Sequence, residues 1–168
     1  RGGAAGEAKS FSAAATNVLA RRDCAVLAIL GSGVQAQSHF EALRLVRDFR
    51  EVRVWSPRNA RAFAERFGVR LARSAADAVR GADVVLVATT SRTPVLMGEW
   101  LSPGMHVNAI GAPRPDWREL DDQVLSKAKL HVEQREAASG TSGTPTSRCS
   151  MATAAPAGRS MPRTTGSS

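Results

Sequence analysis

The sequence predicts an α/β protein with a doubly wound, mostly parallel sheet. Three strand-like runs lie at residues 25–30, 83–88 and 106–110, and the first, which is apolar throughout, has the appearance of a strand that is buried on both faces. Between them lie stretches with apolar residues at helical spacing, and a glycine-rich turn follows the first run. Strands and helices that alternate at these lengths indicate βαβ units with right-handed crossovers.

The first part of the chain predicts a helix, a strand and a second helix. Small apolar residues in SFSAAATNVLARR allow one helix before the strand at 25–30, which reads AVLAIL. Residues 35–46 form the next helix, because Phe40, Leu43 and Val46 recur on one helical face. A second strand follows at 52–55.

The remaining elements alternate in the same way. Ala60, Phe63 and Phe67 define one face of a helix at 59–67, and the hydroxyl of Ser74 can cap a helix that runs to Val79. Further strands are expected at 83–88, 106–110 and 130–133, with a helix at 120–128.

Three zones divide the 168 residues, a length that suggests one domain with appendages. Residues 1–24 are an N-terminal lead-in and helix, and residues 25–138 carry the alternating elements. Residues 139–168 are rich in Ser, Thr, Gly and Pro and lack hydrophobic periodicity. Such a segment cannot offset the entropy of ordering, so we expect a disordered tail.

Composition excludes several classes of protein. With 43% hydrophobic and 23% charged residues, the chain can build a core, which excludes a wholly disordered chain and a collagen-like repeat. No apolar run suits a membrane span or a signal peptide. Two cysteines and three scattered histidines lack metal-ligand spacing, so we expect no metal and a reducing, cytoplasmic compartment.

The formal net charge of +8 invites a nucleic-acid interpretation. Before residue 139, however, the bases are interleaved with acids, and no run of five like charges occurs. Aromatic residues make up only 5% of the chain and form no stacking platform. We therefore expect no nucleic-acid partner.

The residues Gly31-Ser32-Gly33-Val34-Gln35-Ala36 form a G-x-G-x-x-A turn between the first predicted strand and its helix. Gly31 permits the tight turn, Gly33 allows a pyrophosphate to approach the backbone, and Ala36 lets the helix pack on the strand. The N-terminus of the helix then offers free N–H groups to phosphates. In this context the turn predicts a Rossmann-type dinucleotide site, with an ordinary strand-to-helix turn as the alternative.

The end of the second strand bears on the choice of cofactor. An NAD site usually has an acid there for the ribose 2′-hydroxyl, but no acid occurs from residue 52 to 64. Ser56 can instead hydrogen-bond a 2′-phosphate, and Arg58 can pair with it, aided by Arg61. These residues favour NADPH over NADH, and a solvated loop with spare arginines is the alternative.

Two further strand ends face the expected nicotinamide half. Thr89-Thr90-Ser91 follows the strand at 83–88, and Ile110 closes the strand at 106–110. In an open α/β sheet, ligands bind at the carboxyl ends of the strands. The threonine hydroxyls can equally cap a helix, and Ile110 can either pack on the nicotinamide ring or fill the core.

Three segments, ILGSGVQAQSHFEAL, EVRVW and GEWLSPGMHVNAIGAPRPDWRELDD, resemble the ornithine cyclodeaminase/mu-crystallin family over about residues 10–138. The resemblance implies a homodimer that uses NADPH to reduce the C=N bond of cyclic ketimines. It implies, as an alternative, NADPH-regulated binding of thyroid hormone (triiodothyronine) without turnover. It also implies that Trp117 lies near the substrate or hormone pocket, and that NADPH contacts Ser32, Val34, Gln35, Ser56, Pro57, Arg58, Thr89, Thr90 and Ile110.

The chain departs from the family pattern at several points. Glu7 and Ala8 replace an Arg-Thr pair, and Pro113 stands where family members carry a serine or a catalytic aspartate. The family's catalytic lysine belongs to an N-terminal substrate domain that does not match any part of this chain. We therefore expect a truncated form, with its substrate domain largely missing, little activity and no catalytic residue of its own.

Titratable residues near the end of the resemblance are predicted to be structural. The acids Asp116, Glu119, Asp121 and Asp122 are interpreted as a cluster that caps the helix at 120–128, because acids stabilise helix N-termini. His106 and His131 are interpreted as core or edge histidines within strands.

Overall fold

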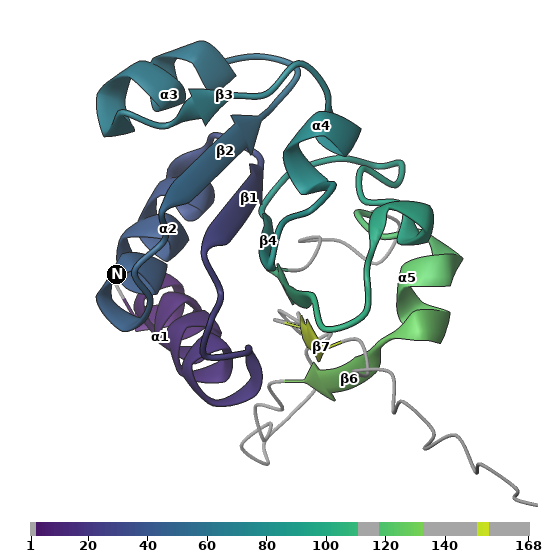
Figure 1. Ribbon diagram of the computed structural model, residues 1–168. Helices are drawn as coiled ribbons and strands as arrows, with labels where there is room; N and C mark the ends of the chain where they lie inside the picture. The colour runs from purple at the N-terminus through teal and green to yellow at the C-terminus, as the bar shows by residue number, and fades with distance from the viewer. Residues whose placement is uncertain (1–2, 111–117, 133–150, 155–168) are drawn as a thin grey trace, which may run out of the picture.

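The structure is a computed structural model that describes residues 3–110, 118–132 and 151–154 (Figure 1). Its elements are α1 (Gly3–Leu19), β1 (Val26–Leu30), α2 (Val34–Val46), β2 (Glu51–Trp55), α3 (Ala60–Phe67), β3 (Arg70–Leu71), α4 (Ala75–Val79), β4 (Val84–Val87), η1 (Gly98–Trp100), β5 (His106–Ala109), α5 (Asp122–Lys127), β6 (Lys129–Val132) and β7 (Met151–Ala154). Each strand and helix predicted up to residue 132 is present, with bounds that differ by no more than two residues, except that α1 begins seven residues before and ends three residues before the segment SFSAAATNVLARR in which it was predicted.

The strands form one sheet in the order β3-β2-β1-β4-β5-β7-β6. The first five strands in this order are parallel, and β1 lies at their centre, where Leu27 pairs with both Val52 and Val84. The strands β7 and β6 run antiparallel to their neighbours. The prediction of a mostly parallel α/β sheet is therefore confirmed.

Helices cover both faces of this sheet, as Figure 1 shows for α1 and α2 on one side and α4 and α5 on the other. Alternate residues of β1 supply the two cores. Leu27 and Ile29 pack with Phe40 of α2 and Phe63 of α3, because strand side chains alternate between faces. Ala28 and Leu30 belong to the opposite core, which includes α4 and α5.

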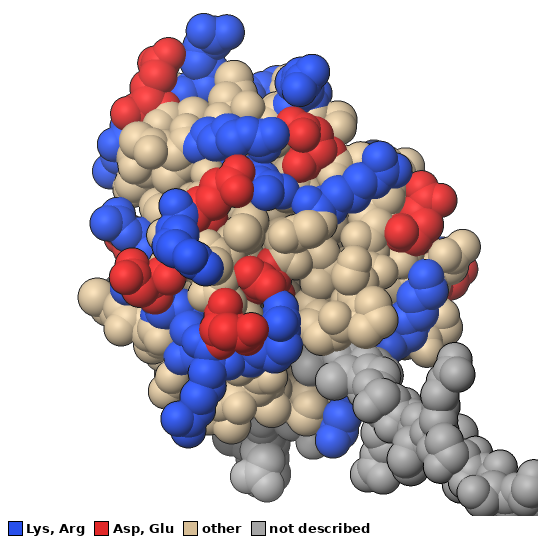
Figure 2. All heavy atoms as spheres, viewed as in Figure 1, with Lys and Arg blue, Asp and Glu red and all other residues tan. Residues whose placement is uncertain are grey.

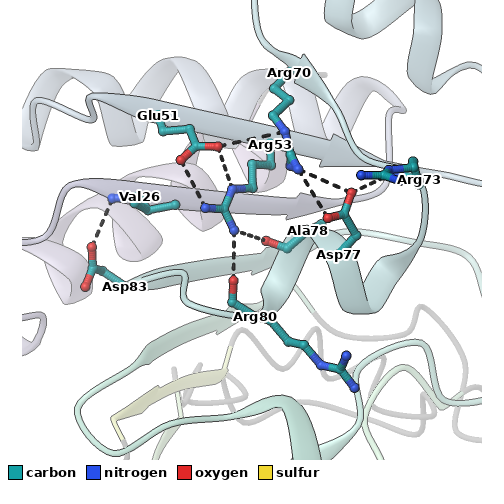
Figure 3. A network of polar contacts seen from close by, with 9 residues as sticks. All are labelled: Val26, Glu51, Arg53, Arg70, Arg73, Asp77, Ala78, Arg80 and Asp83. Carbon is teal, nitrogen blue, oxygen red and sulfur yellow. Dashed lines mark hydrogen bonds and ion pairs between the residues drawn. The ribbon is translucent and has the colours of Figure 1, made fainter.

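Arg53 joins the outer part of the sheet to α4 (Figure 3). Its guanidinium donates to both carboxylate oxygens of Glu51, at 2.8 and 3.0 Å, and to the carbonyl of Arg80 at 2.8 Å. Because Arg80 ends α4, the same side chain satisfies a carbonyl that the helix itself leaves unpaired. The cap predicted at Ser74 is also present, and its hydroxyl accepts from the N–H of Asp77 at 3.0 Å.

Three elements were not predicted, and each depends on contacts distant in sequence. The two exposed residues of β3 pair with β2, and η1 is held by bonds from Gly98 to Asp121. Within the tail predicted to be disordered, residues 151–154 form β7 between β5 and β6. For these four residues the structure differs from the prediction, because main-chain pairing with β5 requires no hydrophobic periodicity.

A layer of buried polar side chains lies between α1 and the rest of the domain. The hydroxyl of Ser12 lies 3.1 Å from Nδ1 of His39, and the amide of Asn108 donates to the hydroxyl of Thr16 at 2.8 Å. Nε2 of His106 lies 3.3 Å from the oxygen of Asn108. Burial lowers the pKa of both His39 and His106 to about 4, so both rings are neutral in the folded protein at neutral pH.

The described surface carries mixed charge. On the face in Figure 2, basic and acidic side chains are interspersed, so the described residues form no continuous basic stripe there. None of the helices in the described ranges is long and apolar enough to cross a membrane. The face in Figure 2 thus shows the same interleaving of bases and acids as the sequence.

The buried histidines predict a loss of stability in mild acid. A histidine with a pKa near 6.5 unfolded and about 4 folded binds a proton more readily in the unfolded chain. The stability that the two neutral rings contribute is therefore fully present above about pH 6.5, and it is lost as the pH drops toward 4. Urea unfolding should show a loss of about 1 kcal/mol per histidine between about pH 7.5 and 5.5.

Variants separate this effect from the titration of acids. His39→Gln and His106→Gln should each remove about one histidine's share of the pH dependence, whatever their effect at neutral pH. An unaltered pH dependence in His39→Gln would refute the assignment for that ring.

Candidate functional site

A cleft of about 650 Å³ opens at the carboxyl ends of β1, β2, β4 and β5. Strand ends of this kind bind ligands in open α/β sheets. With the exception of Arg61, the cleft brings together the residues predicted for the cofactor, namely Gly31, Ser32, Gly33, Val34, Gln35, Ser56, Pro57, Arg58, Thr89, Thr90 and Ile110. Asn59 and Val95 also line it, and sequence analysis did not identify them, because neither belongs to a recognisable motif.

Gly31 lies at the junction where β1 turns toward α2. Its N–H donates to the carbonyl of Trp55 at 2.9 Å, and its φ is +118°, a region that disfavours residues with a side chain. A Cβ at this position would lie 2.1 Å from the carbonyl oxygen of Ala88. Both the backbone angle and the close approach to β4 therefore require glycine here.

Gly33 has a different role, because it faces open space. A Cβ there would have no neighbouring atom within 4 Å, and its φ of −78° is available to any residue. It is the N-cap of the 13-residue helix α2, and no side chain among the described residues caps that end. The first turn of α2 therefore directs its N–H groups and the positive end of its dipole toward the cleft.

Gln35 also belongs to this first turn. Its side-chain oxygen is buried and has no hydrogen-bond partner among the residues that the structure describes. A buried polar atom without a partner is costly, so this oxygen is available to a donor from a ligand.

The end of β2 supplies a polar and basic wall. Ser56 is half-buried, whereas Pro57, Arg58 and Asn59 are exposed. The guanidinium of Arg58 makes no hydrogen bond or ion pair with the described residues, and it lines the cleft directly. Arg61 does not line the cleft, so only Arg58 of the two arginines predicted for a 2′-phosphate is at the site.

On the opposite side, Thr89 is held by Glu119. The N–H and the hydroxyl of Thr89 both donate to Oε1 of Glu119, at 2.6 and 2.7 Å. The hydroxyl oxygen of Thr89 also accepts from the N–H of Ser91 at 3.2 Å. Glu119 is only 4% exposed, and burial raises the pKa of its carboxyl, although the bonds from Thr89 oppose this. Its Oε2 is buried and has no partner within the described residues.

The prediction that Glu119 belongs to a helix-capping cluster is therefore wrong. Asp121 does cap α5, since its carboxylate accepts from the N–H of Val124 at 2.8 Å, and Asp122 lies in the first turn. Glu119 points instead toward a residue 30 positions earlier in the chain. No local pattern indicates that pairing, because only the fold brings the two segments together.

Part of the predicted site lies outside the described residues. These positions are Trp117, which was expected near a substrate or hormone pocket, together with Pro113 and Asp116. His106 is a core residue, as expected, and it lies in the layer beneath α1 rather than in the cleft.

The sheet order and the glycine turn define a Rossmann-like α/β domain. The chain belongs to the ornithine cyclodeaminase/mu-crystallin family, whose model matches residues 5–148. It is 47% identical over 138 residues to ketimine reductase mu-crystallin of Macropus fuliginosus, covering 80% of this chain and 44% of that protein. It is 37% identical over 143 residues to a Δ1-pyrroline-2-carboxylate reductase of Bacillus cereus, with the same coverage.

Solved structures agree with this assignment. The Δ1-pyrroline-2-carboxylate reductase of Thermococcus litoralis, in complex with NADH and L-proline, superposes with a TM-score of 0.69 at 35% identity, covering 74% of this chain and 41% of that one. An archaeal alanine dehydrogenase dimer with bound NAD gives a TM-score of 0.68 at 37% identity, over the same shares of the two chains. The chain spans less than half the length of these relatives.

An alanine should have very different effects on stability at the two glycines of the turn. Gly31→Ala should lower the free energy of unfolding by about 2–4 kcal/mol, because the methyl group collides with β4 and the φ is strained. Gly33→Ala should change it by less than about 1 kcal/mol, since nothing obstructs the methyl group. Urea unfolding of the two variants measures the difference, and equal losses would contradict the geometry described for Gly31.

Proposed function

We propose that this chain is the cofactor-binding part of an NADPH-dependent ketimine reductase that acts on cyclic imines. The observation that carries the proposal is the cleft itself, where a glycine turn, the N-terminus of α2 and Arg58 converge, and no described side chain caps that helix end or pairs with Arg58. These groups suit a ligand with two separated anionic centres.

The residues of the cleft match successive parts of the cofactor. The pyrophosphate fits at Gly33, where the backbone is open and the dipole of α2 attracts negative charge. The 2′-phosphate fits between Ser56 and Arg58, where no acid from residue 52 to 64 would repel it. The nicotinamide half then extends toward the ends of β4 and β5, which carry Thr90 and Ile110.

The named relatives support the class of reaction. Ketimines and Δ1-pyrroline-2-carboxylate both contain a C=N bond, and the relatives are reductases by name. The bound cofactor supplies the hydride in such a reduction. What this chain would contribute is the placement of that cofactor: Gly33 and α2 would hold its phosphates, and Ile110 would offer an apolar surface to its ring.

The family resemblance carries two further expectations, a homodimer and, as the alternative function, NADPH-regulated binding of triiodothyronine. The dimeric archaeal alanine dehydrogenase supports the first. The alternative function predicts saturable hormone binding that requires NADPH, with no consumption of NADPH when an imine is present. Hormone binding and NADPH oxidation measured on the same preparation distinguish it from a reductase.

Calorimetric titration tests the choice of cofactor. Wild-type protein should bind NADPH more tightly than NADH, and Arg58→Asp should weaken NADPH binding on the order of tenfold or more. NADH lacks the 2′-phosphate, so Arg58→Asp should weaken NADH binding by less than about threefold, because the added acid lies far from the charges that NADH does carry.

Arg50→Asp is the matched control, because it makes the same charge change at an exposed position before β2 instead of after it. It should leave the affinity for both nucleotides unchanged. Equal weakening of NADPH and NADH by Arg58→Asp, or tighter binding of NADH by the wild type, would contradict a 2′-phosphate site at Arg58.

A further inference from the structure

Glu119 holds both ends of the loop that forms one wall of the cleft. Its carboxyl accepts the N–H and the hydroxyl of Thr89, where the loop begins. Its main-chain carbonyl accepts the N–H groups of Val95 and Leu96, at 2.9 and 3.1 Å, where the loop ends. Thr89, Thr90, Ser91 and Val95 of this loop all line the cleft.

The loop begins beside the glycine turn. The carbonyl of Ala88, the residue before Thr89, is the atom that a Cβ on Gly31 would meet at 2.1 Å. A change in the path of the chain at Thr89 would therefore alter the wall directly opposite the turn. Because Glu119 is almost fully buried, its carboxyl is held in place by the surrounding core.

These bonds leave Thr89 and Thr90 with different roles. The hydroxyl proton of Thr89 is donated to Glu119, and its oxygen already accepts from Ser91. That hydroxyl therefore has no proton left for a ligand. Thr90 is exposed and lines the cleft, so the side chain free to contact a ligand is the neighbouring one.

We infer that Glu119 is a positioning residue that shapes the nicotinamide half of the cleft by fixing the loop at 89–96. The inference rests on the proposed function, because it assumes that a dinucleotide occupies the cleft. In the sheet, β4 lies on the far side of β1 from β2, so this loop and the end of β2 lie at opposite ends of the cleft. Loss of Glu119 should therefore weaken binding of the nicotinamide half of the cofactor and leave binding of the adenosine half unchanged.

Binding of a whole and a half cofactor tests this division. Glu119→Ala should weaken NADPH binding on the order of tenfold, because the Thr89 N–H and hydroxyl lose their acceptor. Binding of adenosine 2′,5′-bisphosphate, which carries the 2′-phosphate but no nicotinamide, should change by less than about twofold. Glu119→Gln keeps an acceptor oxygen in the same place and should bind NADPH within about threefold of the wild type.

Glu99→Ala is the matched control, since it removes an exposed carboxyl from η1, outside the cleft, and should leave the affinity for both ligands unchanged. If Glu119→Ala does not fold, Thr89→Val removes only the hydroxyl bond. It should weaken NADPH binding less strongly, while the half cofactor is again unaffected.

A spectroscopic signature tests the contact without any ligand. In a ¹H–¹⁵N spectrum the Thr89 amide proton should resonate downfield, because its bond to the carboxyl is short, and it should move upfield much further in Glu119→Ala than in Glu119→Gln, which keeps a weaker acceptor. An amide that does not move, equal weakening of both ligands, or a Glu119→Gln variant as weak as Glu119→Ala would overturn the inference. A wild type that binds neither ligand would overturn the proposed function, and this inference with it.

Discussion

The carboxyl ends of β1 and β4 meet at a backbone contact on which the cleft depends. Gly31 turns the chain from β1 toward α2 at a φ of +118°, and it leaves no space for a side chain beside the carbonyl of Ala88. The contact sets the direction of α2 and the starting point of the loop after β4. One wall of the cleft is therefore the glycine turn, and the opposite wall begins at the strand that the turn contacts.

Charge in and around the cleft is distributed according to burial. The basic side chain of Arg58 is exposed and unpaired within the described residues, where a solvated cation costs little and can attract an anion. The acid Glu119, by contrast, is buried, and its carboxyl accepts hydrogen bonds from Thr89 of the cleft lining. Burial raises the pKa of that carboxyl, which favours its neutral form beside a site for phosphates.

The polar layer beneath α1 shows how the rest of the domain supports this arrangement. Ser12 and Thr16 attach the helix to His39 of α2 and to Asn108 of β5. These partners come from separate parts of the chain, so the layer exists only when the helix and the sheet are assembled. Its histidines are neutral when folded, which links the integrity of the domain to pH.

Local patterns in the sequence were enough to predict the order of the helices and strands and the position of the glycine turn. The run AVLAIL at 25–30 can be recognised because a strand buried on both faces must be apolar throughout, and Gly31 because a tight turn limits side chains. Arg58 was likewise identifiable, since it follows a strand end that lacks an acid. All of these properties extend over a few neighbouring residues, which is why the sequence alone shows them.

Only the tertiary structure decided what Glu119 and residues 151–154 do. Glu119 lies two residues before the cap of α5 and looks like part of it, but its carboxyl reaches Thr89 across 30 positions of the chain. Residues 151–154 have no strand pattern of their own and pair with β5 through the main chain. Hydrogen bonds between distant segments depend on how the sheet brings those segments together, and no local preference of the residues records that proximity.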